Sequence, residues 1–483
     1  MNFRLILKVL GKLLICEALL MLPSLLVSLY YGGRDTRAFL LSMLITALAG
    51  IPLTFLKINR KTIYARDGFA IVALGWILMS FFASLPFVLS GVTPNFIDGF
   101  FEAVSGLTTT GSSILTFVEG QPKGVLFWRS FTHWVGGMGV ILLTLAILPS
   151  LGAGGIQLMK AESPGPNPGK IVPQLKQTAK ILYTIYLVIT VIEIILLKLA
   201  GLSLFDAFIH SFGTVGTGGF SSMNASVGAY NNPAVEIIIT VFTFICGVNF
   251  SLYYLMLKGD FKALSKDSEF RFYSGVVLVS IALITFNLYG RVFNSLGESL
   301  RHSSFQVVTI ISTTGFSSTN FDQWGMFSKI ILFMLMFIGG CAGSTAGAMK
   351  NIRILLLLKI MKRQLLKIIH PNAVYTVRLG NKAVDEKILT GVQGFFFMYI
   401  LVFIIAVLII SLENLDWATT ISSVAATLGN VGPGFGIVGP MGNYSSLSSL
   451  SKFVLSFCMI IGRLEILPVL LLATPSFWKK VNI

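Results

Sequence analysis

The stretch that decides the fold spans residues 100–111 and reads FFEAVSGLTTTG. It is apolar, shorter than the ~20 residues that a membrane-spanning helix needs, and ends in three threonines and a glycine. Glycine permits left-handed backbone angles there, and threonine hydroxyls add oxygens without adding charge. Related turns follow at residues 217–220, 313–316 and 430–433, at intervals of roughly 100 residues. The chain therefore consists of four repeats of one unit.

Each repeat has a long apolar helix, a short apolar segment, the glycine turn and a second long apolar helix. We expect the short segments to enter the membrane and turn back, because non-helical backbone survives at that depth only inside protein or beside water. The second long helices are expected at residues 125–148, 234–257, 327–359 and 453–472.

Two further apolar helices, residues 5–31 and 38–56, precede the repeats. The sequence thus predicts an all-α polytopic membrane protein with ten spans and four re-entrant segments around one pore. The predicted units are an N-terminal two-helix hairpin at 1–66 and pore units at 67–155, 176–260, 269–370 and 384–483.

The composition excludes a soluble globular protein. Of 483 residues, 54% are hydrophobic and 12% are charged, and the mean hydropathy is +0.83. A soluble fold of this size needs more polar surface to cover its core. Most Lys and Arg residues behind the net charge of +16 fall in loops that we assign to the cytoplasm, so both termini are expected inside. The excess charge therefore indicates topology and attraction to membrane lipid, not nucleic-acid binding.

Four such turns around one axis would form rings of backbone and threonine oxygens that replace the hydration shell of a monovalent cation. The partial negative charge at the C-terminal end of each short helix also favours a cation. Acidic residues at the outer ends of these helices are expected to cap them and attract cations: Asp98, Asp206, Glu298 and Asp416, with Glu102 adding one more. The predicted ion-coordinating residues are Thr109, Thr110, Gly111, Thr217, Gly218, Gly219, Thr313, Thr314, Gly315, Asn430, Val431 and Gly432.

A second polar feature interrupts the third unit, where residues 339–347 read GGCAGSTAG. So many small residues should break the helix locally. Arg463 is a charge within the last apolar run, and we expect its partner to be this loop, below the turns. The alternatives are close helix packing for the loop and an ion pair with Glu465 for Arg463. The predicted gate comprises Gly339, Gly340, Gly343, Ser344, Thr345, Gly347, Lys350 and Arg463.

With these motifs, and with GGFS at 218–221 and GRLE at 462–465, the chain resembles the Trk/Ktr/HKT superfamily of potassium transporters along essentially its whole length. The resemblance implies four pseudo-fourfold units around one pore, a homodimer, and a TrkA-like cytosolic regulatory ring that binds nucleotides. It assigns the four turn glycines to a selectivity filter, and the interrupted helix with Arg463 to a gate. In the superfamily, glycine at all four filter positions accompanies potassium preference, and serine at the first accompanies sodium. The loop departs from the pattern, since two alanines stand at 345–350 where relatives carry more glycine.

The sequence therefore predicts a protein of the bacterial cytoplasmic membrane that conducts K⁺ passively, is gated from the cytoplasm and needs no cofactor. An enzyme is the least supported class, because no acid, base, nucleophile or metal set is found. The alternatives are the K⁺-binding subunit of a pump-type ATPase (KdpA-like), a sodium-permeable relative and a secondary transporter for an organic solute. Secondary transporters usually show inverted repeats, whereas these four repeats share one orientation.

Overall fold

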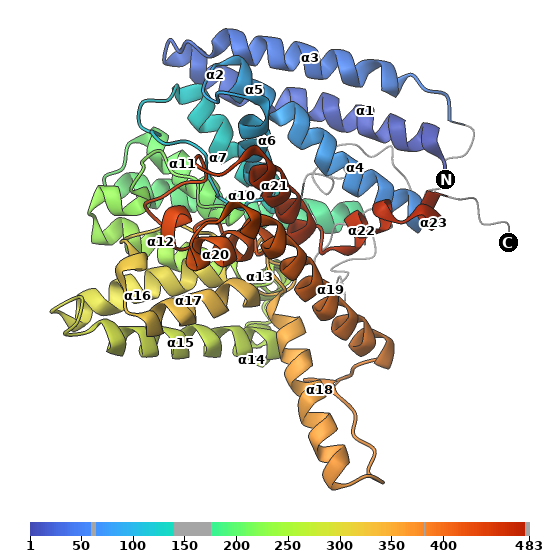
Figure 1. The fold of residues 1–483 in the computed structure, drawn as a ribbon, viewed down its shortest axis with the longest axis vertical. Helices are drawn as coiled ribbons and strands as arrows, with labels where there is room; N and C mark the ends of the chain where they lie inside the picture. Colours follow the sequence, from blue (N-terminus) through green and yellow to red (C-terminus); the bar gives the residue numbers. More distant parts are fainter. Residues whose placement is uncertain (59–63, 140–174, 381, 479–483) are drawn as a thin grey trace.

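The structure is a computed structural model that describes residues 1–58, 64–139, 175–380 and 382–478, and it is almost entirely helical (Figure 1). Within these described ranges, the one sheet pairs two short strands, β1 (Arg378–Leu379) and β2 (Lys382–Ala383). Among the described residues, five helices are long and apolar enough to cross a membrane, or six if one sharply bent pair counts as a single span. The predicted multi-pass helical membrane protein is thus confirmed.

The N-terminal segment forms a helical hairpin along one side of the molecule (Figure 1). Helices α1 (Phe3–Leu20) and α2 (Leu22–Tyr30) adjoin at Met21, and α3 (Thr36–Thr54) returns beside α1. Two glycines let α1 and α3 approach closely, because a Cβ atom added to Gly50 would lie 2.9 Å from the carbonyl oxygen of Gly11. Packing of α1 against α4 (Ala65–Ala83) attaches the hairpin to the rest of the chain.

The remaining chain contains four pairs of helices, each pair made of a short helix and the helix that follows it. The short helices are α6 (Phe96–Leu107), α11 (Leu204–Gly216), α16 (Leu296–Ile311) and α20 (Trp417–Leu428). The following helices are α7 (Lys123–Gly137), α12 (Pro233–Cys246), α17 (Met326–Ile338) and α21 (Ser449–Arg463). Contacts run from α6 through α7, α11, α12, α16, α17, α20 and α21 and back to α6. The eight helices therefore form a closed circuit.

Longer helices precede the last three short ones: α10 (Leu175–Leu199), α15 (Ser268–Leu288) and α19 (Glu386–Ile410). The remaining helices are α5 (Leu85–Leu89), α13 (Phe250–Leu257), α14 (Lys262–Lys266), α18 (Asn351–Ile369), α22 (Leu467–Ala473) and α23 (Pro475–Trp478). Single 3₁₀ turns cover Ser226–Tyr230, Phe321–Gln323, Ser411–Glu413 and Gly436–Val438.

Short polar side chains fix where three of the short helices begin. Asn95, Ser203 and Asp416 are N-cap residues, and each accepts a hydrogen bond from a backbone N–H in the first turn of its helix. Such bonds satisfy donors that a helix start leaves free, and so they help to fix the first residue of each helix.

The second long helices are interrupted more often than we predicted. The expectation of continuous helices at 234–257 and 453–472 is wrong. The first breaks between α12 and α13 with a 91° bend, and Asn249 caps the new helix by accepting from the N–H of Ser251. The second breaks between α21 and α22, where Glu465 and Ile466 have φ of 55° and 69°.

The third long helix breaks where the small residues predicted it, between α17 and α18. The predicted helix 125–148 is described only to residue 139 and ends at Gly137, and the boundary at 155 lies outside the described residues.

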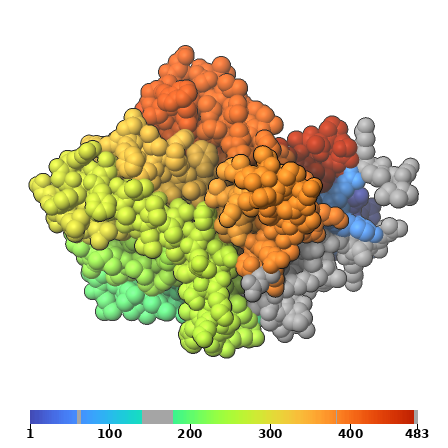
Figure 2. All heavy atoms as spheres, turned by 90° about the horizontal axis from the view of Figure 1, so that it is seen from below, coloured from blue at the N-terminus to red at the C-terminus, as the bar shows by residue number. Residues whose placement is uncertain are grey.

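Two helices extend the molecule at one end. α18 and the first turns of α19 project away from the other helices in Figure 1, and β1 and β2 lie between these two helices in the chain. Figure 2 looks from that end and shows the orange residues of this segment standing out from the surface. An ion pair between Arg363 and Glu386 joins the two helices.

The hairpin makes a specific polar contact that leads to a stability prediction. The buried Asp35, in the turn before α3, accepts from the N–H of Val125 at 2.8 Å in the first turn of α7, and from the hydroxyl of Ser28 at 2.5 Å. Asp35→Ala should therefore destabilise the protein by about 1–3 kcal/mol, because a buried N–H loses its acceptor. Thermal unfolding in detergent, followed by size-exclusion chromatography, measures this. The exposed Arg34→Ala is the control, and equal midpoints for both variants would refute the role of Asp35.

Candidate functional site

The four short helices end in the same kind of turn. Two residues before each turn glycine, the backbone adopts a positive φ: 55° at Thr109, 57° at Thr217, 59° at Thr313 and 53° at Asn430. The next N–H then bonds the carbonyl five residues back, as from Thr110 to Ser105 at 2.9 Å and from Thr314 to Thr309 at 2.8 Å. This is the Schellman pattern of a helix C-terminus.

Three of these turns place threonine where a Schellman motif ordinarily has glycine or asparagine. A β-branched residue with positive φ is strained, and such strain persists only where the surroundings impose it. Threonine at these positions supplies a hydroxyl group that glycine and asparagine lack. The hydroxyls of Thr109 and Thr313 each accept a hydrogen bond from a residue of the predicted gate. The strain therefore marks a place where the fold needs an uncharged oxygen.

The four turn glycines form a closed ring, which we call the glycine ring: Gly111, Gly219, Gly315 and Gly432, with φ of 82°, 81°, 78° and 101°. A Cβ atom added to any of them would lie within 3.0 Å of a carbonyl oxygen in a neighbouring turn. In order, these oxygens belong to Gly218, Thr314, Val431 and Thr110. Each turn thus touches the next one, and the last touches the first.

A cavity of about 80 Å³ lies against the glycine ring and is lined by all four glycines. Its walls also carry hydroxyl groups, among them those of Ser112, Ser221 and Ser317. Within the described parts of the chain, no group of three or more His, Cys, Asp or Glu residues could hold a metal ion. The described residues that line this cavity offer oxygens of carbonyl, amide and hydroxyl groups, and no Asp or Glu is among them.

The predicted acidic residues lie at the starts of the short helices. Asp98, Asp206 and Glu298 fall in first turns, and Asp416 is an N-cap. Burial acts to raise the pKa of Asp416, but hydrogen bonds from Thr419 outweigh it and lower that pKa from its ordinary value. Asp98 is buried and paired with Lys452 at 2.6 Å, so its charge is neutralised locally.

Our expectation that Glu102 lies with these outer acidic residues is wrong. It lies in the middle of α6, is fully buried and pairs with Arg129 at 2.5 Å. The sequence contained a signal for this pair, because Arg129 is a charge in an apolar segment and needs a partner.

The loop between α17 and α18, residues 339–350, lies directly against the turns. The N–H of Gly347 donates to the hydroxyl of Thr313 at 2.7 Å, and a Cβ atom added to Gly347 would lie 2.8 Å from Asn430. Inside the loop, the buried ammonium of Lys350 donates to the carbonyls of Ser344 and Ala346. Ala348 and Lys350 both have positive φ, 54° and 64°, so the loop is held in a strained shape.

Arg463 connects this loop to the first unit. Its guanidinium donates to the carbonyl of Thr345 at 2.7 Å and to the hydroxyl of Thr109 at 3.2 Å. It also reaches the carbonyls of Gly136 and Gly137, at 2.6 and 2.7 Å, at the end of α7. The structure thus brings Arg463 and the loop together, and the carboxylate of Glu465 pairs with Arg353.

The second and third units also hold the loop, through residues that our sequence analysis did not single out. At the α12–α13 break, the carbonyl of Gly247 accepts from Cys341 at 2.8 Å, and the N–H of Phe250 donates to Gly343 at 3.1 Å. On α15, Glu269 accepts from the N–H groups of Ala342 at 2.6 Å and Ile352 at 3.0 Å. One carboxylate oxygen therefore ties both ends of the loop.

This tether leads to a prediction about the loop. Glu269→Ala should raise hydrogen–deuterium exchange across residues 339–352, because the N–H groups of Ala342 and Ile352 lose their acceptor. Glu269→Gln is the matched control, since its amide oxygen can still accept from both groups. Mass spectrometry of the purified protein measures the exchange, and an unchanged rate in the alanine variant would contradict the tether.

The long apolar helices and the ring of uncharged oxygens define a helical membrane protein with a polar site between its short helices. Comparison with known proteins gives its family: residues 35–480 match the family described as TrkH, cation transport protein. The chain belongs to the TrkH family, within the Trk/Ktr/HKT superfamily, as the sequence resemblance predicted.

Its relatives cover its whole length. It is 41% identical over 487 residues to the Trk system potassium uptake protein TrkH of Salmonella typhimurium, covering 99% of this chain and 100% of that protein. It is 34% identical to TrkG of Escherichia coli K12, with 97% of each chain covered. The crystal structure of the potassium transporter TrkH from Vibrio parahaemolyticus matches with a TM-score of 0.90 at 37% identity, covering 99% of this chain and all of that one.

Proposed function

We propose that this protein conducts K⁺ across the bacterial cytoplasmic membrane, through a selectivity filter made by the four glycine turns. The observation that carries the proposal is the glycine ring, in which every glycine meets a carbonyl oxygen of a neighbouring turn. Carbonyl and threonine oxygens in such a ring can replace the water around a bare K⁺ ion. Relatives named as potassium uptake proteins over the full chain length support K⁺ as the ion.

The same proposal includes four repeats around one pore, preceded by the two-helix hairpin. The closed circuit of eight helices and the common turn conformation support this arrangement. The C-terminal ends of α6, α11, α16 and α20 all lead into the ring, so their dipoles place partial negative charge there.

The loop 339–350 and Arg463 act as the gate in this proposal. The hydroxyl of Thr313 accepts from Gly347 of the loop, and that of Thr109 accepts from Arg463, so both donors compete with an ion for these oxygens. The guanidinium charge of Arg463 also repels a cation close to the filter. Movement of the loop and of Arg463 would free both hydroxyls for an ion and would remove the charge of Arg463 from the filter.

A cytosolic nucleotide-binding ring of the TrkA type is the proposed regulator, acting on a homodimer of this chain. The relatives are named as parts of a Trk system, which supports further components. The competing function, the K⁺-binding subunit of a pump-type ATPase, requires K⁺ movement that depends on ATP and on a second subunit. The passive conductor that we propose would instead move K⁺ down its gradient without ATP.

The filter proposal predicts the effect of a single hydroxymethyl group. Gly111→Ser should lower the K⁺/Na⁺ flux ratio by about tenfold, because the added atoms displace the carbonyl of Gly218 and widen the site. Cation flux into proteoliposomes measures the ratio. Gly91→Ser is the control, because Gly91 has a similar φ of 72° but no atom within 4 Å of an added Cβ. An unchanged ratio in a folded Gly111 variant would refute the filter assignment.

The gate proposal predicts a leak. Arg463→Ala removes the contacts to Thr345, Thr109 and α7, so K⁺ flux without any partner should rise by about tenfold, equivalent to about 1.4 kcal/mol. The control is Arg363→Ala, which removes an arginine from the projecting α18. Equal basal flux in both variants would make Arg463 a structural residue only.

A further inference from the structure

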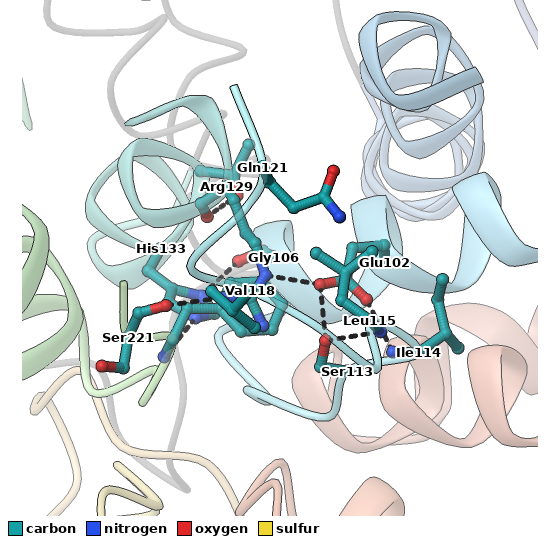
Figure 3. A network of polar contacts seen from close by, with 12 residues as sticks. Glu102, Gly106, Ser113, Ile114, Leu115, Val118, Gln121, Arg129, His133 and Ser221 are labelled. Carbon is teal, nitrogen blue, oxygen red and sulfur yellow. Dashed lines mark hydrogen bonds and ion pairs between the residues drawn. The ribbon is translucent and has the colours of Figure 1, made fainter. Parts of the chain in front are cut away.

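Two side chains of α7 lie between the first and second turns, on neighbouring turns of that helix. Figure 3 shows Arg129 and His133 pointing toward the same region, with Glu102 and Gly106 of α6 on one side and Ser221 on the other. Arg129, His133 and Glu102 are all almost completely buried. This cluster belongs neither to the acidic residues at the outer ends of the short helices nor to the proposed gate.

Arg129 joins the two units. Its guanidinium pairs with Glu102 at 2.5 Å and donates to the carbonyl of Ser221 at 3.0 Å, two residues beyond the second turn glycine. It also stacks over the ring of Phe220, with 3.7 Å from Cζ to the ring centroid. A planar guanidinium can make these contacts simultaneously, which an ammonium group cannot.

Glu102 extends the connection to the first unit. Its carboxylate accepts from the N–H of Ile114 at 2.9 Å and from the hydroxyl of Ser113 at 3.0 Å, so it holds the segment that leaves the first turn. One ion pair therefore ties the segments that follow both Gly111 and Gly219.

His133 repeats the connection one helical turn further along α7. One ring nitrogen, Nδ1, lies 2.8 Å from the carbonyl of Gly106, and the other accepts from the N–H of Phe220 at 3.2 Å. Since the N–H of Phe220 must donate, the ring is neutral, with its proton on the nitrogen facing Gly106. A Cβ atom added to Gly218 would overlap this ring, so the imidazole also packs against the second turn.

We propose that Glu102, Arg129 and His133 form a clamp that fixes the spacing of the first and second turns and thereby determines ion specificity. The clamp residues are positioning residues. They act through the backbone of residues 113–114 and 220–221, and the inference rests on the proposed filter. The pair is also electrically neutral. Arg129 lines the same cavity as the turn glycines, and without Glu102 its charge would repel cations there.

The test measures the K⁺/Na⁺ flux ratio of purified variants in proteoliposomes. Glu102→Gln keeps the shape of the side chain but loses the ion pair, and we expect the ratio to fall by about tenfold, equivalent to about 1.4 kcal/mol of discrimination. Arg129→Lys keeps the charge but not the planar fork, and we expect a smaller fall in the same direction. If the Gln variant fails to elute as a folded protein, the Lys variant carries the test.

The matched control is Glu236→Gln, which breaks the ion pair between the buried Glu236 of α12 and Arg301 of α16, at 3.0 Å. Because this pair lies outside residues 113–114 and 220–221, which the clamp holds, its variant should keep the wild-type ratio. The double variant Glu102→Gln/Arg129→Met restores neutrality without restoring the contacts, so its ratio should stay low. Recovery in the double variant would show that charge alone matters and would overturn the clamp.

The outcomes separate the clamp from the filter proposal. A wild-type protein that conducts K⁺ and Na⁺ equally refutes the filter itself. A selective wild type, together with folded Glu102→Gln and Arg129→Lys variants that keep its ratio, refutes the clamp and leaves the filter standing.

Discussion

The contact between each turn glycine and a carbonyl oxygen of a neighbouring turn is the constraint on which the rest of the structure depends. There is no room for a Cβ atom at any of the four positions, and each glycine has a positive φ. The ring closes only if four short helices deliver the same Schellman turn to one place, and the circuit of eight helices does this. Strained threonines beside the glycines then supply the hydroxyls that meet the loop and Arg463.

Buried charge is arranged around this ring in a consistent way. Glu102 pairs with Arg129, Asp98 with Lys452 and Arg353 with Glu465, so each of these charges is compensated close by. Burying an unpaired charge costs several kcal/mol, which explains why these residues occur as pairs. The guanidinium of Arg463 donates to the carbonyls of Thr345, Gly136 and Gly137 and to the hydroxyl of Thr109, which places its charge close to the turns.

Much of this arrangement follows from the sequence. The thickness and apolarity of the membrane core limit the length and composition of every segment inside it. The apolar runs, the short segments and the four glycine turns can therefore be recognised without a structure. The break at 339–350 is visible because it holds so many small residues. The breaks after Cys246 and Arg463 are not, because each depends on local capping and on contacts with another unit. The sequence shows Arg129 as a charge in an apolar segment that needs a partner, but it does not show which residue that partner is, because Glu102 lies in a different helix and meets Arg129 only through the packing of α6 on α7.

Cation flux into proteoliposomes that contain the wild-type chain alone tests the central claim most directly. K⁺, Rb⁺, Na⁺ and Li⁺ would be compared under identical gradients and without ATP. A ring of carbonyl and hydroxyl oxygens with glycine at all four positions predicts that K⁺ and Rb⁺ enter much faster than Na⁺ and Li⁺. Equal entry of all four ions would contradict the account, because the closed ring would then not act as a filter.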